Sequence, residues 1–452
     1  MIGPQIRDRR RPRTLLRARI ILIASCIAWS LALSPAPALA EGEGFYGPLE
    51  LKSSERQLMK NAGAYEDQFV RRGYRYDSPE LEAALSRLGA QLAPKPTDPY
   101  MRYRFHILRD AGVNAFALPD GQLYVNTGLL AQLENEAQLA AVLAHEVQHT
   151  AGHHGILSYR STRRKLIAGA VLGPITLGIG DVFLAMSVFG YSRDLEEEAD
   201  RLGAKRMLKA GYDPRQMRGV FEILMQDPEG ENPVFKSKWS THPELEARIA
   251  YTQEMIPGLT QGVDLASLKI GARGYRALVR RASLETAQDL VAADRPRSAV
   301  ALAKRLVRED DSDPAAHLAL GDARFALGAR TMLEGEADLT NREKWKNAVT
   351  RERYTRSERE QRLLETPEGR TVLKKNLESA RQSYQRALAL DPGAAEAHRG
   401  LGYVLERQDR SVDAGKELVI YLRARPQAPD RAVVMNELKG INTAIKNGGK
   451  TK

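Results

Sequence analysis

Apolar residues recur at helical spacing over much of the chain. The pattern runs through residues 41–100, where prolines close the segment, and it returns from about Leu129 to His153. A third stretch extends from Asp194 to Lys209, with Gly211 well placed to end a helix. Because residues three and four apart share one helix face, these stretches predict amphipathic helices.

Between the first two helical stretches, apolar and polar residues alternate instead. The alternation covers residues 103–106 and 114–125, and Asp120-Gly121 separates two apolar runs in the second part. Alternating runs on both sides of an Asp-Gly pair are typical of a β-hairpin. We therefore predict a hairpin in this region.

The first 40 residues have the organisation of a signal peptide. Seven arginines precede an apolar run from Ile20 to Leu33, which is too short to span a bilayer comfortably. Ala38 and Ala40 then form the small-residue pattern that signal peptidase recognises. We predict cleavage after Ala40 and export to the periplasm, where the chain is either free or membrane-associated; an uncleaved anchor is the alternative.

Removing this leader changes the charge of the chain. The formal net charge is +11, and residues 1–40 hold seven Arg and one Asp, so subtracting their +6 leaves +5. A mildly basic chain of this size gives no strong case for nucleic-acid binding. Cys26 is the single cysteine and lies in the leader, so a metal site in the mature chain would use His, Asp and Glu.

The strongest chemical signal is an H-E-x-x-H motif that begins at His145. His145 and His149 are four residues apart, so on a helix both can direct a ring nitrogen at one zinc ion. Glu146 lies on the adjoining flank and suits the general base that activates water. Two histidines packed on a core helix without a metal are the alternative.

A catalytic zinc ion needs a third protein ligand and an open position. Glu196 is the best candidate, from a second helix 47 residues after His149. Asp200 is four residues further, on the same helix face, and would orient a ligand imidazole through its second nitrogen. The alternative is an exposed acidic first turn, because Glu196 begins a run of three glutamates that favours a helix N-terminus.

Residues 166–190 are apolar over a length that would suit a transmembrane helix. Gly173-Pro174 and Asp181 interrupt the run. Moreover, residues on both sides of it are candidates for one metal site, which requires both sides to lie in one compartment. We predict a buried or interfacial hairpin, with peripheral contact to a membrane surface as the alternative.

From about residue 263 the pattern changes to alanine-rich helices with an internal repeat. Residues 313–321 are echoed by residues 391–402, and each copy follows an amphipathic helix rich in small residues. The pattern resembles tetratricopeptide (TPR) repeats, helix–turn–helix units that stack into a groove. The charged stretch 331–370 is either a degenerate repeat or an inserted helix. A plain helical bundle is the alternative for the whole region.

Four segments resemble the M48 peptidase family: residues 114–130, 140–146, 192–200 and 240–248. With the leader and the TPR-like part, the whole chain resembles the BepA-like periplasmic proteases of that family. The resemblance implies an α+β gluzincin-type metalloprotease domain followed by an all-α TPR-like helical repeat domain.

The resemblance also implies roles for individual residues. His145, His149 and Glu196 would bind one zinc ion per chain, with Glu146 as the base and Asp200 supporting the ligands. An edge strand for an extended substrate would be formed by Asn114, Ala115, Phe116 and Ala117.

His242, which precedes Pro243, has three interpretations. The family implies that it can reach the zinc as a regulatory ligand and hold the enzyme inactive, since a fourth protein ligand closes the open position. It could instead stabilise the oxyanion, or be a loop histidine with neither role. His153 and His154 are expected to be structural or polar surface residues.

We accordingly predict a signal peptide over residues 1–40, an M48-like zinc metalloprotease domain over 41–260 and a TPR-like domain over 261–452. The predicted function is an exported zinc endopeptidase that degrades misfolded or stalled outer-membrane proteins. Its partners would be unfolded or misassembled proteins and, through the TPR groove, the outer-membrane assembly machinery. The alternative is a periplasmic chaperone or assembly adaptor with latent proteolysis.

Overall fold

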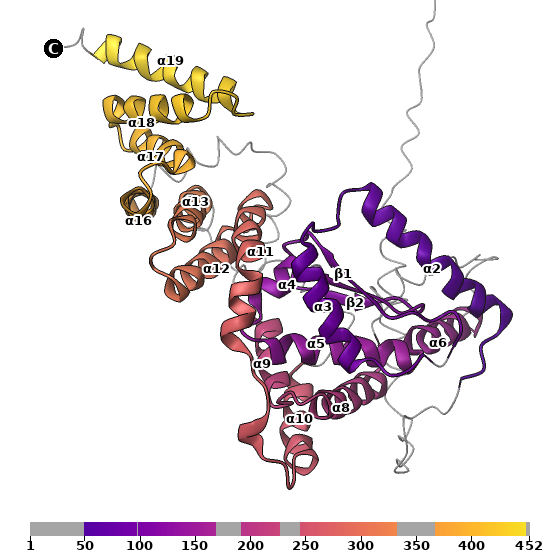
Figure 1. Ribbon diagram of the computed structural model, residues 1–452. Coiled ribbons are helices and arrows are strands. Elements are labelled where there is room, and N and C mark those ends of the chain that lie inside the picture. Colours follow the sequence, from indigo (N-terminus) through magenta and orange to yellow (C-terminus); the bar gives the residue numbers. More distant parts are fainter. Residues whose placement is uncertain (1–48, 97, 169–190, 227–244, 332–366, 449–452) are drawn as a thin grey trace, which may run out of the picture. The chain divides into compact units, whose positions relative to one another are not determined.

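The computed structural model describes residues 49–96, 98–168, 191–226, 245–331 and 367–448 (Figure 1). Several predictions from the sequence fall outside these ranges. They concern the signal peptide, His242, all but the first residues of the 166–190 segment and most of the charged stretch 331–370.

A three-stranded mixed sheet lies beside two N-terminal helices. The helices are α2 (Ser53–Arg71) and α3 (Pro79–Leu92), and the strands are β1 (Arg104–Leu108), β2 (Ala115–Ala117) and β3 (Gln122–Asn126). The strand order is β1-β3-β2, with β1 parallel and β2 antiparallel to β3. Strand β2 therefore lies at one edge of the sheet.

The predicted hairpin is confirmed as the β2–β3 pair. Its turn contains Gly121 at φ 94°, a left-handed conformation that favours glycine. A Cβ at this position would also lie 2.5 Å from the carbonyl oxygen of Arg102. Both constraints exclude a larger side chain at this position of the turn.

The single helix predicted from about Leu129 to His153 is wrong, because two helices occupy this stretch. They are α4 (Thr127–Gln132) and α5 (Glu136–Ala151). Asn135 separates them: its backbone is extended, and its side chain accepts a hydrogen bond from the N–H of Gln138 at 2.9 Å. Such a cap satisfies an otherwise unpaired donor and starts a new helix.

Helix α5 is the central element of the N-terminal core, which includes buried residues of α3 and of the sheet. All of its residues from Ala137 to Thr150 are buried, as expected for a helix in which the residues from Leu139 to Ala144 are all apolar. It contacts α3, β2, α8 and α9. The flanking helices are α6 (His154–Ala168), α8 (Arg193–Lys209), α9 (Gln216–Met225) and α10 (Leu245–Leu259).

The helix predicted over Asp194–Lys209 is confirmed as α8. Gly211 follows its end at φ 80°, and the N–H groups of Gly211 and Tyr212 donate to carbonyl oxygens of the last turn. The glycine thus reverses the chain in a left-handed conformation, as the sequence indicated.

Every described element of the C-terminal region is a helix, as the repeat pattern predicted. Consecutive described helices pack against one another along the chain. They are α11 (Ala272–Ala292), α12 (Pro296–Glu309), α13 (Pro314–Thr331), α16 (Pro367–Leu390), α17 (Ala395–Arg407), α18 (Ser411–Ala424) and α19 (Arg431–Gly448).

Helix α11 contributes to two clusters of buried residues. Tyr275 and Val279 in its first half are buried in the N-terminal core, and the Tyr275 hydroxyl donates to the Leu130 carbonyl oxygen at 2.7 Å. Leu290 in its second half packs in the cluster formed by α12 and α13, which also includes Ala131 of α4. The N-terminal core and the α12–α13 pair are therefore joined by continuous packing.

Tyr384 of α16 occupies the centre of the second helical-repeat core. It is 1% exposed, and its hydroxyl donates to Asp322 at 2.7 Å. Glycines on both neighbouring helices make room for its ring: a Cβ at Gly400 would lie 2.3 Å from Tyr384 Cζ, and one at Gly321 would lie 2.6 Å from Cε1. The small residues noted in the repeat pattern thus allow α13, α16 and α17 to pack closely.

Gly400→Ala is expected to destabilise this region by about 1–3 kcal/mol, the usual cost of overpacking a filled core. Gly440→Ala is the matched control, because a Cβ at Gly440 of α19 meets nothing within 4 Å. The control should gain about 0.4–1 kcal/mol from reduced freedom of the unfolded chain. Thermal unfolding, monitored by circular dichroism, measures both changes in stability. Equal unfolding midpoints for the two variants would contradict the close packing of Gly400 against Tyr384.

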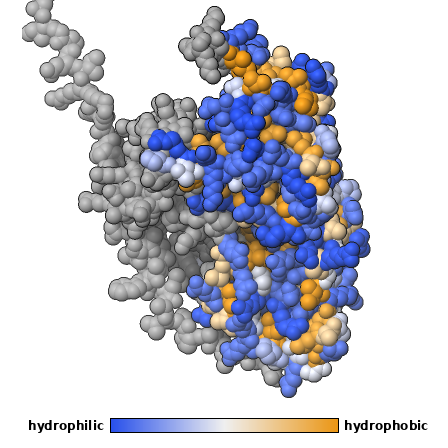
Figure 2. Space-filling view, turned by 90° about the vertical axis from the view of Figure 1, so that its left-hand side faces the viewer, coloured by the Kyte–Doolittle hydropathy of each residue, from blue (hydrophilic) through white to orange (hydrophobic). Residues whose placement is uncertain are grey.

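The described surface is mixed in character. Figure 2 shows hydrophilic and hydrophobic residues interspersed over the described part of one face. Among the described helices, none combines the length and the apolar character that crossing a bilayer requires.

Candidate metal centre

The two motif histidines project from one face of α5 toward the same point. Their Nε2 atoms are 2.9 Å apart and their ring centroids 4.5 Å apart. His145 is 3% exposed and His149 is 2% exposed. The spacing of four residues on a helix, recognised in the sequence, therefore places both rings where one ion could contact them.

Glu196 reaches the same point from α8. Its Oε2 is 3.6 Å from His145 Nε2 and its Oε1 is 3.5 Å from His149 Nε2. Gly203 on α8 permits this approach, since a Cβ there would already lie 3.3 Å from the backbone nitrogen of His145. The packing of α8 on α5 thus delivers a carboxylate to the pair of imidazoles.

The three side chains form a donor set that fits zinc. One ligand atom from each of His145, His149 and Glu196 lies within 4.8 Å of the others, and all three residues are buried. Two imidazole nitrogens and one carboxylate oxygen are the three protein ligands of one common kind of catalytic zinc site, which leaves the fourth position open. Among the described residues, no other group of His, Cys, Asp and Glu meets this test.

Asp200 supports His145 from behind. The His145 Nδ1–H donates to Asp200 Oδ1 at 2.8 Å, which leaves Nε2 for a metal. Burial alone would raise the pKa of Asp200, but the charges of Arg248 and His145 outweigh it and hold that pKa well below its ordinary value. The carboxylate is therefore charged and orients the imidazole, which is the contact the sequence predicted.

Arg248 is a residue of the site whose role the sequence did not indicate. It lies on α10 and is 2% exposed. Its Nε and Nη2 donate to Asp200 at 2.8 and 2.6 Å, and its Nη1 is 2.9 Å from Glu196 Oε2. The guanidinium carbon also lies 4.5 Å from the centroid of the Phe221 ring. One buried cation thus holds two carboxylates of α8 in place.

Glu146 faces the edge of the sheet. The N–H of Ala117 in β2 donates to its carboxylate. Burial, together with the nearby charge of Glu196, raises the pKa of Glu146 to about 8 despite the opposing effects of Arg248 and this hydrogen bond. Carboxylates whose pKa values are shifted upward in this way are typical of acid–base sites.

Two aromatic neighbours of His149 were not assigned a role from the sequence. Tyr191 stacks on the His149 ring, with centroids 3.9 Å apart and planes at 16°. His154 is fully buried and its Nδ1 lies 2.9 Å from His149 Nδ1. Of the two expected alternatives for His154, a structural residue or a polar surface residue, the burial supports the structural one. The turn between α5 and α6 brings its ring onto His149.

The remaining candidate residues are placed as follows. Ala115, Phe116 and Ala117 form β2, and Asn114 precedes it, with its carbonyl oxygen accepting from the N–H of Asn126 at 3.0 Å. Phe116 stacks on Tyr124 with centroids 5.1 Å apart. Strand β2 contacts α5, so the edge strand runs beside the helix that carries the motif.

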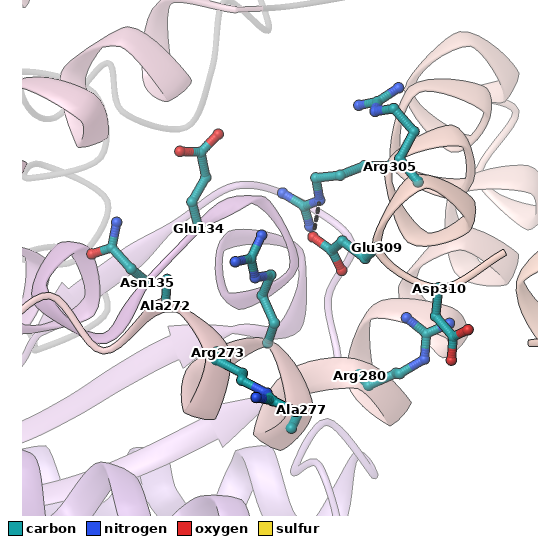
Figure 3. Close-up of a pocket in the computed structure, with 11 residues that line it drawn as sticks. Glu134, Asn135, Ala272, Arg273, Ala277, Arg280, Arg305, Glu309 and Asp310 are labelled. Carbon is teal, nitrogen blue, oxygen red and sulfur yellow. Dashed lines mark ion pairs between the residues drawn. The ribbon is translucent and has the colours of Figure 1, made fainter. Parts of the chain in front are cut away.

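A separate pocket of about 820 Å³ lies between α11, α12 and the linker that joins α4 to α5 (Figure 3). Five arginines and three acidic residues line it. Arg280 is engaged by Asp313 at 2.9 Å, and Arg305 Nη1 donates to the Gln132 carbonyl oxygen at 2.9 Å. Arg273, Arg276 and Arg308 are exposed. The excess of cations favours an acidic ligand over a basic one.

Comparison with known families bears on both parts of the chain. Residues 79–256 match the pattern described as Peptidase family M48. This part of the chain is an M48 peptidase domain. Residues 284–330 match the tetratricopeptide repeat and residues 372–409 match the TPR repeat. The chain therefore combines an M48 domain with C-terminal TPR repeats, as the sequence motifs indicated.

Three relatives of this M48 domain illustrate the match. The chain is 33% identical over 162 residues to the mitochondrial metalloendopeptidase OMA1 of Schizosaccharomyces pombe, covering 35% of this chain and 48% of that one. A putative beta-barrel assembly-enhancing protease of Vibrio cholerae is 30% identical, covering 39% and 40%. The beta-barrel assembly-enhancing protease of Escherichia coli is 26% identical, covering 38% of each chain. The chain thus spans less than half the length of these relatives.

Proposed function

We propose that this protein is a zinc-dependent endopeptidase that acts on unfolded protein segments. The observation that carries the proposal is the convergence of His145, His149 and Glu196 on one point with Glu146 beside them, in a domain of the M48 family. The carboxylate of Glu146 is what distinguishes a hydrolytic site from a purely structural metal site of the same ligands.

The chemistry follows from the positions of the side chains. A zinc ion, when bound, supplies Lewis-acid activation of water and of the scissile carbonyl group. Glu146 accepts the proton of the attacking water and returns it to the leaving amine. Asp200 fixes the ring of His145, and Arg248 fixes the carboxylates of Asp200 and Glu196. Burial of the site strengthens each of these interactions.

We propose that the substrate binds as an extra strand on β2. Strand β2 is an edge of the described sheet, and the Ala117 N–H joins it to the Glu146 carboxylate. An extended chain added to a sheet edge is held by main-chain hydrogen bonds and so needs no particular sequence. Unfolded or misassembled polypeptides, rather than folded proteins, expose such segments.

The TPR repeats are proposed to bind partner proteins. TPR units stack into grooves that bind polypeptides. The arginine-lined pocket of Figure 3 lies between α12, α11 and the linker that joins α4 to α5. Two of the relatives are named as beta-barrel assembly-enhancing proteases. These names, together with the predicted cleavable leader, support a role of this protein in the periplasmic quality control of outer-membrane proteins. Because both relatives are named as proteases, the names do not favour a chaperone or adaptor that acts without proteolysis.

We expect the purified mature protein to contain one zinc ion per chain and to cleave an unfolded protein such as casein. Removal of the metal by a chelator should abolish cleavage, because without the zinc ion no Lewis acid activates the water or the scissile carbonyl group. Stoichiometric zinc should restore it. Elemental analysis and gel-based cleavage assays provide the measurements. A protein that cleaves casein at full rate after complete loss of zinc would contradict the proposal.

A further inference from the structure

The buried side chain of His154 contacts the ring of His149 on the side away from the proposed metal position. Helix α5 ends at Ala151, and His153 then adopts a left-handed backbone at φ 52°, so that α6 starts at His154 and directs this side chain back toward α5. Gly152 makes room for the ring, because a Cβ there would lie 2.4 Å from His154 Nε2. His154 is 0% exposed.

The contact joins the two Nδ1 atoms at 2.9 Å. Since His149 directs Nε2 toward Glu196 and His145, its Nδ1 carries the proton when Nε2 binds a metal. Two facing ring nitrogens can form one hydrogen bond only if one donates and the other accepts. His154 Nδ1 is then the acceptor, and the proton of neutral His154 lies on Nε2.

The other side of His154 faces an acidic residue. Its Nε2 is 3.5 Å from Glu198 Oε1, and Glu198 is 2% exposed. Glu198 Oε1 also accepts from Gln148 Nε2 at 3.2 Å, and Gln148 Oε1 accepts from Arg206 Nη2 at 2.8 Å. A carboxylate facing Nε2 favours the tautomer that the His149 contact requires. The arrangement extends from α5 through α6 to α8.

We propose that His154, oriented by Glu198, is a positioning residue that fixes the tautomer and ring orientation of His149 for metal binding. The inference rests on the proposed zinc site. His149 would then have the kind of support that Asp200 gives His145, except that the imidazole of His154 lies between His149 and the carboxylate of Glu198. Partners behind metal-bound histidines raise metal affinity by about 10–100-fold in other proteins.

The first test is a zinc titration of the full protein against a competing chelator of known affinity. His154→Leu should weaken zinc binding about 10–100-fold. His154→Gln, which keeps an acceptor and a donor, should recover most of the affinity. His153→Asn is the neighbouring control, because asparagine tolerates a left-handed backbone, and it should bind zinc as the wild type does.

Unfolding of the zinc-free proteins separates positioning from packing. A purely structural role would lower the thermal midpoint of zinc-free His154→Leu and leave its zinc affinity unchanged, and that result would overturn the proposal. If the wild type itself binds no zinc, the proposed function fails. If the wild type binds zinc and cleaves casein but His154→Leu binds zinc equally well, only this inference fails.

A second measurement needs no variant. In nitrogen-15 NMR spectra of the zinc-loaded wild type, assigned with the His154→Gln spectrum, His154 should carry its proton on Nε2 and His149 on Nδ1. A proton on Nδ1 of His154 would contradict the proposal, whatever the stability of the variants.

Discussion

Glu146→Gln is expected to lower kcat/KM for cleavage of an unfolded protein by about 10²–10⁴-fold, the usual contribution of a positioned general base. The zinc content should stay at the wild-type value. Both quantities come from one preparation, by steady-state cleavage of a fluorogenic peptide and by elemental analysis.

The reason lies in the position of the carboxylate. Glu146 follows His145 in the chain and is 2% exposed, and it faces β2, where the substrate is proposed to lie. Glutamine keeps the size of the side chain and accepts the hydrogen bond from the Ala117 N–H, but it takes up no proton. The variant should therefore remove proton transfer and leave the three proposed metal ligands in place.

Glu197→Gln is the matched control, since it removes a carboxylate from α8 next to Glu196 and leaves the proposed metal ligands unchanged. It should cleave the peptide at close to the wild-type rate. Wild-type cleavage by Glu146→Gln would exclude Glu146 as the base. Loss of zinc from this variant would show instead that Glu146 helps to hold the metal.

Arg248→Met is expected to lower the free energy of unfolding of the zinc-free protein by about 3–5 kcal/mol. Urea-induced unfolding of the full protein measures the change. Arg248 is 2% exposed and pairs with two carboxylates that are themselves buried, Asp200 and Glu196. Methionine fills similar space but leaves both charges without their cation.

The magnitude depends on burial. Exposed ion pairs contribute about 0–1 kcal/mol, because water already solvates both partners. Removing one partner of a buried pair strands a desolvated charge, which is several times more costly. Arg281→Met is the control: its side chain is 74% exposed, and it pairs with Glu285 one turn away. A loss for Arg248→Met no larger than for Arg281→Met would contradict the arrangement described for α8 and α10.

Local sequence patterns predicted those features that depend on a few neighbouring residues. The spacing of His145 and His149 is a property of one helix turn, and Gly121 and Gly211 mark reversals that other residues adopt poorly. Repeated small residues in the C-terminal region likewise indicated stacked helical repeats, and the contact of Gly400 with Tyr384 shows how closely these helices pack.

Features that depend on tertiary packing could not be predicted in the same way. The break between α4 and α5 depends on Asn135, whose capping role competes with an uninterrupted apolar pattern. The contact of His154 with His149 depends on the left-handed turn at His153, which the spacing of residues along the chain does not indicate. Arg248 follows Glu196 by 52 residues, and only the packing of α10 on α8 brings the two together.

We expect His145, His149 and Glu196 to bind a single zinc ion. Anomalous diffraction at the zinc absorption edge, from crystals of the Glu146→Gln protein grown with zinc, would locate the ion. One peak should lie within bonding distance of both Nε2 atoms and the Glu196 carboxylate. No peak at that point, or a zinc ion bound only by other residues, would contradict this expectation.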